Sequence, residues 1–317
     1  MVEIPKEILR NPTVDAIYAK YEKNNGEWRR PHLGASQIGN DCDRALWYSF
    51  RWCTAPDFGG RMIRLFESGY IQEKRLITDL KDIGVVVHHV HPNTGRQIQY
   101  SEFGGHFAGS LDAIAQGFPE APKTWHVVEC KSSNTKNFTK LKKVGVKEAH
   151  PVHYAQVQIY MGWSKLDRAY YISVCKDTDE IYGERVYLDK VFVQQITKKA
   201  ENIIFRETPP PKIGDRDQFC CKWCEHVEIC HGVGLPLVSC RTCAHVTPCN
   251  DGTWNCVINA KDLDINQQIL ACEQHIFIPK LVPMEPTDVT ISTVTYGDVT
   301  NGPGFVPSKE MWKWVRE

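Results

Sequence analysis

The spacing of apolar side chains divides the first third of the chain into predicted helices. Segments 5–25 and 36–52 are predicted to be helical, and Ser36 is a plausible N-cap for the second. A longer helix is predicted from about Arg61 to Leu80, and Gly84 ends its pattern. The broad apolar face of this helix consists of Ile63, Phe66, Tyr70, Leu76, Ile77 and Leu80.

From Val85 the pattern changes to short runs that are rich in β-branched and aromatic residues. Four predicted strands, VVVHHV, RQIQYSEF, HFAGSLDAIAQ and TWHVVECKS, precede a helix at about 151–163. Two more, DRAYYISVC and ERVYLD, flank the turn KDTDEIYG, and Asp189 caps a helix to about Phe205. These elements predict a mixed α/β fold with a mainly antiparallel sheet flanked by helices.

Three consecutive prolines, Pro209–Pro211, break regular structure, and the chain beyond them is irregular and rich in cysteine. We therefore expect three parts: a large domain over 1–235, a cysteine-rich module over 236–282, and a loosely ordered tail over 283–317.

Composition narrows the class of protein. The chain has 317 residues, of which 42% are hydrophobic and 24% charged, so it can bury a core and is not a disordered tail protein. No apolar stretch is long enough to span a membrane, and the N-terminus has no signal-peptide pattern. The thirteen cysteines are then better explained as metal ligands in a reducing compartment than as disulfides. We expect a cytoplasmic protein.

Net charge is zero, so any nucleic-acid surface must come from local clustering. One cluster lies between positions 131 and 147, which hold no acidic residue, although a solvated charged face is the simpler explanation of such a run. Its lysines are Lys131, Lys136, Lys140, Lys142, Lys143 and Lys147.

Three residues form the most informative chemical pattern. Asp112 lies in one predicted strand, and Glu129 and Lys131 lie two apart in another, so the latter two point to the same face. Carboxylates and a lysine are what metal-assisted phosphodiester hydrolysis requires. An E-x-K pair alone is common by chance, but here the surrounding strand is apolar, so a buried Glu and Lys need a partner.

The order of motifs resembles the RecB-like branch of the PD-(D/E)XK nucleases over roughly residues 36–230. Gly69 to Glu73 match G-x-x-x-(H/E), and Gly109 to Asp112 match G-x-x-D. Glu129 to Lys131 match E-x-K. Gln156 to Tyr160 match Q-x-x-x-Y, whose spacing of four places both residues on one helix face.

The resemblance implies a restriction-endonuclease-like core, with a central mixed sheet, that hydrolyses DNA with Mg²⁺ or Mn²⁺. Asp112 and Glu129 would bind metal, Lys131 would be the catalytic lysine, and Glu73 an accessory carboxylate. Gln156 and Tyr160 would support the site or contact DNA. Single-stranded DNA or duplex ends are the implied substrates, with protein partners in replication, recombination or repair, in a phage or a repair system. An endonuclease or nickase, or a silent DNA-binding or assembly module, remains an alternative.

A first cysteine group follows the prolines, where Cys221, Cys224 and Cys230 have C-x2-C-x5-C spacing. It is similar to the triplet of iron–sulfur RecB-like nucleases, including those of CRISPR adaptation and of AddB type, whose fourth ligand lies upstream, as Cys42 does here. The resemblance implies a [4Fe-4S] cluster with a structural role, and zinc is the alternative. Cys220 could replace Cys221.

A second cysteine group has the spacing of a small zinc module but more candidates than zinc has ligand positions. The favoured set is Cys240, Cys243, Cys256 and Cys272, with His275 as a substitute for one of them. His245 and Cys249 are weaker candidates. His106, His150 and His153 lie near the nuclease motifs but are predicted to be packed or exposed rather than catalytic.

Overall fold

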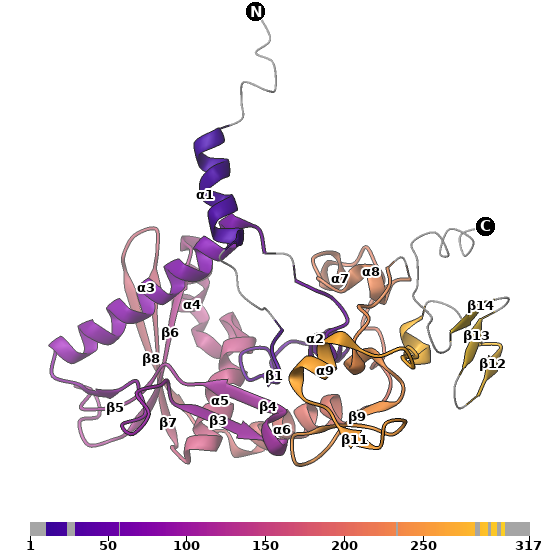
Figure 1. The fold of residues 1–317 in the computed structure, drawn as a ribbon. Helices are drawn as coiled ribbons and strands as arrows, with labels where there is room; N and C mark the ends of the chain where they lie inside the picture. Colours follow the sequence, from indigo (N-terminus) through magenta and orange to yellow (C-terminus); the bar gives the residue numbers. More distant parts are fainter. Residues whose placement is uncertain are drawn as a thin grey trace, which may run out of the picture.

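The computed structural model describes residues 11–23, 29–56, 58–232, 234–282, 286–290, 293–296 and 299–301 (Figure 1). The helices are α1 (Pro12–Lys23), α2 (Asp43–Phe50), α3 (Gly60–Asp82), α4 (Thr135–Ala149), α5 (Pro151–Ser164), α6 (Lys190–Ile204), α7 (Phe219–Lys222), α8 (Val227–Cys230) and α9 (Ile265–Leu270). Short 3-10 helices are η2 (Phe103–Gly105), η3 (Cys240–Thr242) and η4 (Pro279–Leu281).

The strands form four sheets within these residues. Those before the prolines are β1 (Leu33–Gly34), β2 (Val86–His88), β3 (Gln99–Glu102), β4 (Phe107–Ser110), β5 (Ala113–Gln116), β6 (His126–Ser133), β7 (Arg168–Cys175) and β8 (Ile181–Tyr187). Those beyond the prolines are β9 (Val246–Pro248), β10 (Trp254–Cys256), β11 (Lys261–Asp262), β12 (Asp288–Val289), β13 (Val294–Tyr296) and β14 (Val299–Asn301).

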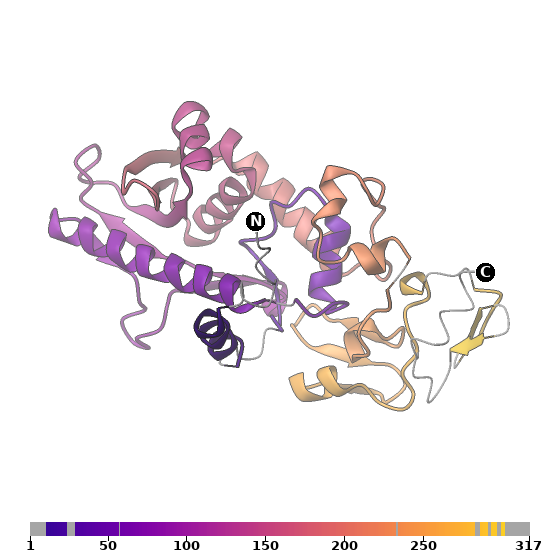
Figure 2. The same ribbon diagram turned by 90° about the horizontal axis from the view of Figure 1, so that it is seen from above.

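The central sheet has five strands in the order β2-β5-β6-β7-β8. Only β6 and β7 pair in parallel, and the other three pairings are antiparallel. Figure 2 shows α3 on one side of this sheet and α4, α5 and α6 on the other. The prediction of a mixed α/β fold with a central mixed sheet flanked by helices is confirmed.

Strand β6 lies in the middle of the sheet, and its side chains alternate between two hydrophobic clusters. Val128 packs with Leu76 and Leu80 of α3, whereas Val127 belongs to the larger cluster that includes Leu141 of α4. Because both faces of β6 are covered, its first five residues are buried. A charged side chain among these five residues, as at Glu129, is therefore held in the protein interior.

A smaller sheet, in the order β1-β4-β3, lies beside the central one. In it β1 pairs in parallel with β4 through Leu33 and Phe107. This pairing brings residues around position 33 next to strands that are about 70 positions later in the chain. It builds a wall that no local sequence pattern predicts.

The cysteine-rich segment packs onto the larger domain, beside α2 in Figure 1. Cys240, Trp254 and Leu281 belong to the same hydrophobic cluster as Phe50 and Phe107. The segment also contains a three-stranded sheet, β11-β10-β9, and helix α9. The expectation that nearly everything beyond the prolines is irregular was therefore wrong.

Three other predictions needed correction. The helix expected over 36–52 begins only at Asp43, with Cys42 rather than Ser36 at its N-cap. The Asn40 side chain accepts a hydrogen bond from the backbone N–H of Cys42, which holds the preceding turn. Helix α4 was missed, although Asn134 caps it by accepting from the N–H of Asn137.

Helix α3 matches its predicted bounds closely, and Gly84 follows it at φ 89°. Its buried face is narrower than predicted, because only Leu76, Ile77 and Leu80 of the predicted apolar face are buried. Tyr70 is 72% exposed. Residues 5–10 and 24–25 of the helix predicted over 5–25, and much of the predicted tail over 283–317, lie outside the described residues.

Among the helices in the described ranges, none combines the length and hydrophobicity that a membrane span requires.

Candidate active site

The predicted acidic residues gather where β6 meets the turn between β4 and β5. Asp112 was expected within a strand, but it lies in that turn, because the chain passes there from the small sheet to the central one. Its Oδ2 accepts a hydrogen bond from the backbone N–H of Cys130 at 2.7 Å. Lys131 Nζ forms an ion pair with Glu129 Oε1. Asp112, Glu129 and Lys131 are thus joined through one short piece of β6.

Glu129 has an unusual environment for a carboxylate. Its side chain is 0% exposed, and its Oε2 atom has no hydrogen-bond partner within the described residues. A buried anionic oxygen without a partner is unfavourable unless a cation or donor reaches it. The arrangement therefore leaves one coordination position for a ligand that the protein itself does not supply.

The carboxyl groups of the site have raised pKa values, because they are buried and, for Glu129 and Glu73, lie close to Asp112. Burial raises the pKa of Glu129 to about 8, and the neighbouring Asp112 adds to the shift while Lys131 opposes it. Burial and Asp112 raise the pKa of Glu73 to about 7. The pKa of Asp112 is also raised by burial, against the effect of Lys131. A bound divalent cation would remove this repulsion.

Lys131 keeps its charge in the same surroundings. Burial alone would lower its pKa, but Glu129 and Asp112 outweigh burial, so the pKa of the ammonium group is raised. The site therefore contains a fixed cation beside at least two acidic groups. This is the charge pattern that a phosphodiester and a divalent ion together would balance.

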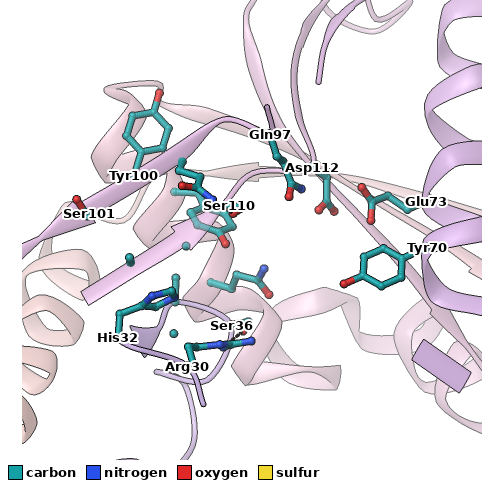
Figure 3. Close-up of a pocket in the computed structure, with 17 residues that line it drawn as sticks. Arg30, His32, Ser36, Tyr70, Glu73, Gln97, Tyr100, Ser101, Ser110 and Asp112 are labelled. Carbon is teal, nitrogen blue, oxygen red and sulfur yellow. Dashed lines mark hydrogen bonds between the residues drawn. The ribbon is translucent and has the colours of Figure 1, made fainter. Parts of the chain in front are cut away.

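The acidic residues open into a cleft of about 450 Å³. Figure 3 shows the carboxylates of Glu73 and Asp112 pointing toward one another, with Tyr70 beside them. Gln156 and Tyr160 also line this cleft, whereas Glu129 lies behind it in the core. The opposite wall comes from residues 30–36 and from strands β3 and β4. The cleft wall residues on that N-terminal side are Arg30, His32, Gly34, Ala35 and Ser36.

The two motif glycines differ in what requires them. A Cβ on Gly109 would lie 2.6 Å from the Tyr160 hydroxyl oxygen and 2.8 Å from Ala35 Cβ. Gly109 is therefore needed for Tyr160 to approach the strand that leads to Asp112. A Cβ on Gly69 would meet nothing within 4 Å, so packing does not require that glycine.

Gln156 and Tyr160 are buried, at 5% and 2% exposure. Burial raises the pKa of Tyr160, Glu129 adds to that shift, and a hydrogen bond with Gln156 opposes it. Both side chains thus lie between the acidic cluster and the cleft wall, where they can support the site.

Sequence reasoning missed several residues of the cleft. Tyr70 was assigned to the apolar face of α3, although its spacing of three from Glu73 is a helical signal for a shared face. Arg30 carried no signal, because it reaches the cleft through the β1–β4 pairing. His153 lies close enough to Lys131 that burial and that cation lower its pKa to about 3.

The four predicted residues of the first cysteine group surround one small cavity. Cys42, Cys221, Cys224 and Cys230 all line it. Burial raises the pKa of the Cys224 thiol, and Cys42 and Cys230 add to the shift, so these groups interact. Cys220 lies on the same cavity, with its Sγ 3.8 Å from that of Cys221, so it is an alternative to Cys221.

The favoured residues of the second cysteine group also come together. Burial raises the pKa of Cys240 to about 12, with further contributions from Cys243, Cys272 and Cys256. The Cys256 Sγ accepts a hydrogen bond from Asn259 Nδ2 at 3.5 Å.

The other candidates of the second group differ in their surroundings. His275 is buried, with Nε2 3.3 Å from the Thr242 hydroxyl and Nδ1 without a partner in the described residues. His245 is partly buried, and this burial lowers its pKa. Cys249 is partly buried.

None of these sets is closed around an ion. Over the ranges that the structure describes, no group of three or more His, Cys, Asp or Glu side chains is already arranged to hold a metal.

No protein-family profile and no curated protein matches this sequence. Among solved structures, the chain is similar to SSO0001, with 16% identity, a TM-score of 0.41, and 70% of this chain and 97% of that chain covered. LHK-Exo in complex with dAMP shares 15% identity at a TM-score of 0.38, covering 60% and 90%; LHK-Exo is an alkaline exonuclease from Laribacter hongkongensis. A phage-related exonuclease from Haemophilus somnus 129PT shares 12% identity at a TM-score of 0.39, covering 54% and 91%. At these values the likeness is distant, and the function must be argued from this chain's own residues.

Proposed function

We propose that this protein is a metal-dependent DNA nuclease, in first place an exonuclease that hydrolyses phosphodiester bonds of single-stranded DNA or DNA ends. The observation that carries the proposal is the buried Glu129, whose Oε2 lacks a partner among the described residues, beside Asp112 and Lys131. Buried acidic groups that repel one another are unfavourable in a purely structural role. An endonuclease or nickase on the same scaffold is the alternative within this class.

The donor set fits Mg²⁺ or Mn²⁺. Asp112 and Glu129 offer carboxylate oxygens, which are the ligands that these hard cations prefer, and Glu73 lies near enough to Asp112 to act as an accessory. When bound, such an ion would lower the pKa of a water molecule and offset charge on the phosphate.

The protein's own side chains have distinct roles in this proposal. The Cys130 amide fixes the Asp112 carboxylate, which keeps one of its oxygens in place. Lys131 holds its proton at Nζ beside Glu129 and is available to stabilise charge on the phosphate oxygens. Tyr160, packed against Gly109, and Gln156 keep the cleft wall in position.

A catalytically silent DNA-binding or assembly module is the competing class. That class of protein would not need the acidic cluster, whereas the ion pair with Lys131 uses only one oxygen of the buried Glu129 and leaves the other without a partner among the described residues.

We further propose that the first cysteine group holds a [4Fe-4S] cluster, with zinc as the alternative, and that the second holds one zinc ion. For the second group, the Cys240 thiol interacts with those of Cys243, Cys272 and Cys256, which supports one shared thiolate site.

The decisive experiment is a cleavage assay on end-labelled single-stranded and duplex DNA with Mg²⁺, Mn²⁺ or EDTA. We expect cleavage with either metal and none with EDTA, with products that shorten from an end. Internal cuts in a closed circle would favour the endonuclease alternative. DNA binding without cleavage under every metal condition would favour the silent module.

A further inference from the structure

Arg241 is a buried cation that connects the cysteine-rich segment to the larger domain. It lies between Cys240 and Thr242 in η3, and its guanidinium carbon lies 3.7 Å from the centroid of the Trp52 ring. Its Nη1 donates a hydrogen bond to the Phe50 carbonyl at 2.9 Å, and its Nε donates to Gln268 Oε1 at 3.0 Å. All these partners hold the guanidinium group in one orientation.

The third donor of Arg241 reaches the N-terminal wall of the catalytic cleft. Nη2 donates to the Pro31 carbonyl oxygen at 2.9 Å. Trp52, on which Arg241 stacks, donates from Nε1 to the Arg30 carbonyl oxygen at 2.8 Å. Two successive carbonyls at the start of that wall are therefore held by one stacked pair of side chains.

Beyond these anchors the wall continues as a strand. The N–H groups of Leu33 and Ala35 donate to the carbonyls of His106 and Ala108 at 2.8 and 2.9 Å. Arg30, His32 and Ser36 then line the cleft opposite the acidic residues. The position of this wall therefore depends on β4 on one side and on Arg241 with Trp52 at its start.

A second contact joins the cysteine-rich segment to the β3 part of the same wall. A Cβ on Gly252 would lie 2.0 Å from the Gly104 carbonyl oxygen, and a Cβ on Gly104 would lie 2.1 Å from the Gly252 nitrogen. Both glycines have positive φ, at 94° and 64°. This backbone contact lies at the η2 turn, directly after β3, whose residues line the cleft.

We infer that the cysteine-rich segment is a positioning element for the substrate-binding wall of the cleft, and that Arg241 is its main positioning residue. Arg241 does not touch the acidic cluster in this proposal. It acts through Pro31 and Trp52 on the wall that a DNA strand would contact beside the carboxylates. The inference rests on the proposed nuclease function for its kinetic readout.

The test compares Arg241→Met and Trp52→Phe with Arg51→Met, all in the full-length protein. Arg51 is a matched control because it is equally buried and its guanidinium group lies over the Trp254 ring. Its hydrogen bonds go to the carbonyls of Arg241, Val246 and Arg206 rather than to the cleft wall. Steady-state cleavage of a single-stranded oligonucleotide with Mn²⁺ gives KM and kcat separately.

We expect KM to rise about tenfold in Arg241→Met, which loses the charge-assisted hydrogen bond to the Pro31 carbonyl. In Trp52→Phe, which loses the neutral hydrogen bond to the Arg30 carbonyl, KM should rise about threefold. In both variants kcat should stay within about twofold of wild type, since the acidic cluster is untouched. Arg51→Met should lower the Tm as Arg241→Met does and leave KM within about twofold of wild type.

Hydrogen exchange of the Leu33 and Ala35 amides gives a readout that does not depend on cleavage. We expect faster exchange in Arg241→Met and Trp52→Phe than in wild type or Arg51→Met. If wild type fails to cleave DNA, the proposed function is wrong, while the exchange result still decides the positioning role.

If Arg241→Met does not fold, Trp52→Phe decides the question. Unchanged KM and unchanged exchange in Trp52→Phe would overturn the inference. So would a loss of kcat at constant KM, or an equal rise of KM in Arg51→Met.

Discussion

The acidic cluster and the two cysteine groups are all sets of candidate ligands, but the fold holds them in different ways. Glu129 and Lys131 stand on the central strand of a five-stranded sheet, with packed helices on both faces. Cys221 and Cys230 stand on helices of four residues each, and Cys272 is exposed. Regular structure fixes the acidic residues, whereas the cysteines depend on short segments that regular structure does little to stabilise.

This difference separates the two kinds of site by their effect on the fold. Burying Glu129 beside Asp112 opposes folding, because burial raises the pKa of both carboxyl groups and Asp112 raises that of Glu129 further. Metal bound by thiolates contributes folding free energy directly, on the order of 10 kcal/mol in small zinc domains. Changes in the cleft should therefore affect activity, and changes in the cysteine groups should affect stability.

The largest expected effect lies in the cleft. Asp112→Asn and Glu129→Gln should each reduce kcat for DNA cleavage about 1000-fold, because each removes a metal-binding charge that supplies several kcal/mol to the transition state. Lys131→Met should have an effect of similar direction. The Tm should fall little or rise, since the Asn and Gln variants keep the shape of the side chain and remove repulsion.

The exposed Glu148→Gln is the neutral control for these variants. A wild-type cleavage rate in Asp112→Asn or Glu129→Gln would show that the acidic cluster is not the catalytic site. A large fall in Tm without a selective loss of activity would erase the contrast with the cysteine groups.

The second effect distinguishes the two cysteine groups from each other. Cys42 and Cys221 are far apart in the sequence of the larger domain, while Cys240 and Cys272 lie within one short segment of the sequence. Closing the longer loop restricts the unfolded chain more, by about 1–2 kcal/mol on polymer scaling. Cys224→Ser should therefore lower the Tm of the whole protein further than Cys243→Ser does.

Elemental analysis and limited proteolysis complete this test. Anaerobically purified wild type should contain iron, with broad absorbance near roughly 400 nm that Cys224→Ser loses. It should also contain one zinc ion per chain, which Cys243→Ser loses together with protease resistance of residues 236–282. Zinc without iron would assign zinc to the first group, and protein with neither metal would overturn both assignments.

The sequence predicted most of the central sheet and the acidic cluster for one physical reason. Strand alternation places Glu129 and Lys131 on one face wherever the strand ends, so an error of a residue or two at its bounds does no harm. Asp112 was placed in a strand although it lies in a turn, because the change of sheet at that point leaves no local signal. Helix α4 was missed because its many lysines leave few apolar positions, of which Phe138 and Leu141 are buried, to show a helical period.

The cleft wall and its anchor could not be predicted from the sequence. Arg30 reaches the cleft through a parallel pairing between residues that are about 70 positions apart, and such pairing follows from the tertiary fold rather than from local pattern. Arg241 has the sequence appearance of a surface residue, since a buried arginine without a carboxylate partner is rare. Its partners are backbone carbonyls, which no residue pattern reveals.

The smallest expected effect concerns His153, whose ring is neutral in the folded protein. Burial, Lys131 and His150 lower its pKa from 6.5 to about 3, and the Tyr171 hydroxyl lies 2.9 Å from its Nδ1. Between about pH 6.5 and pH 3 the His153 ring is therefore protonated in the unfolded chain but neutral in the folded protein. This contribution to stability is complete above pH 6.5 and is lost as the pH falls below it, by at most about 1.4 kcal/mol per pH unit.

His153→Gln removes the titrating group, so its Tm should fall by a few degrees less than that of wild type between pH 6.5 and 5. The ring of His150 is stacked on that of His153. His150→Gln is therefore the control, and its Tm should follow the wild-type curve more closely. Parallel melting curves of wild type and His153→Gln across this range would show that His153 does not titrate as a buried neutral group.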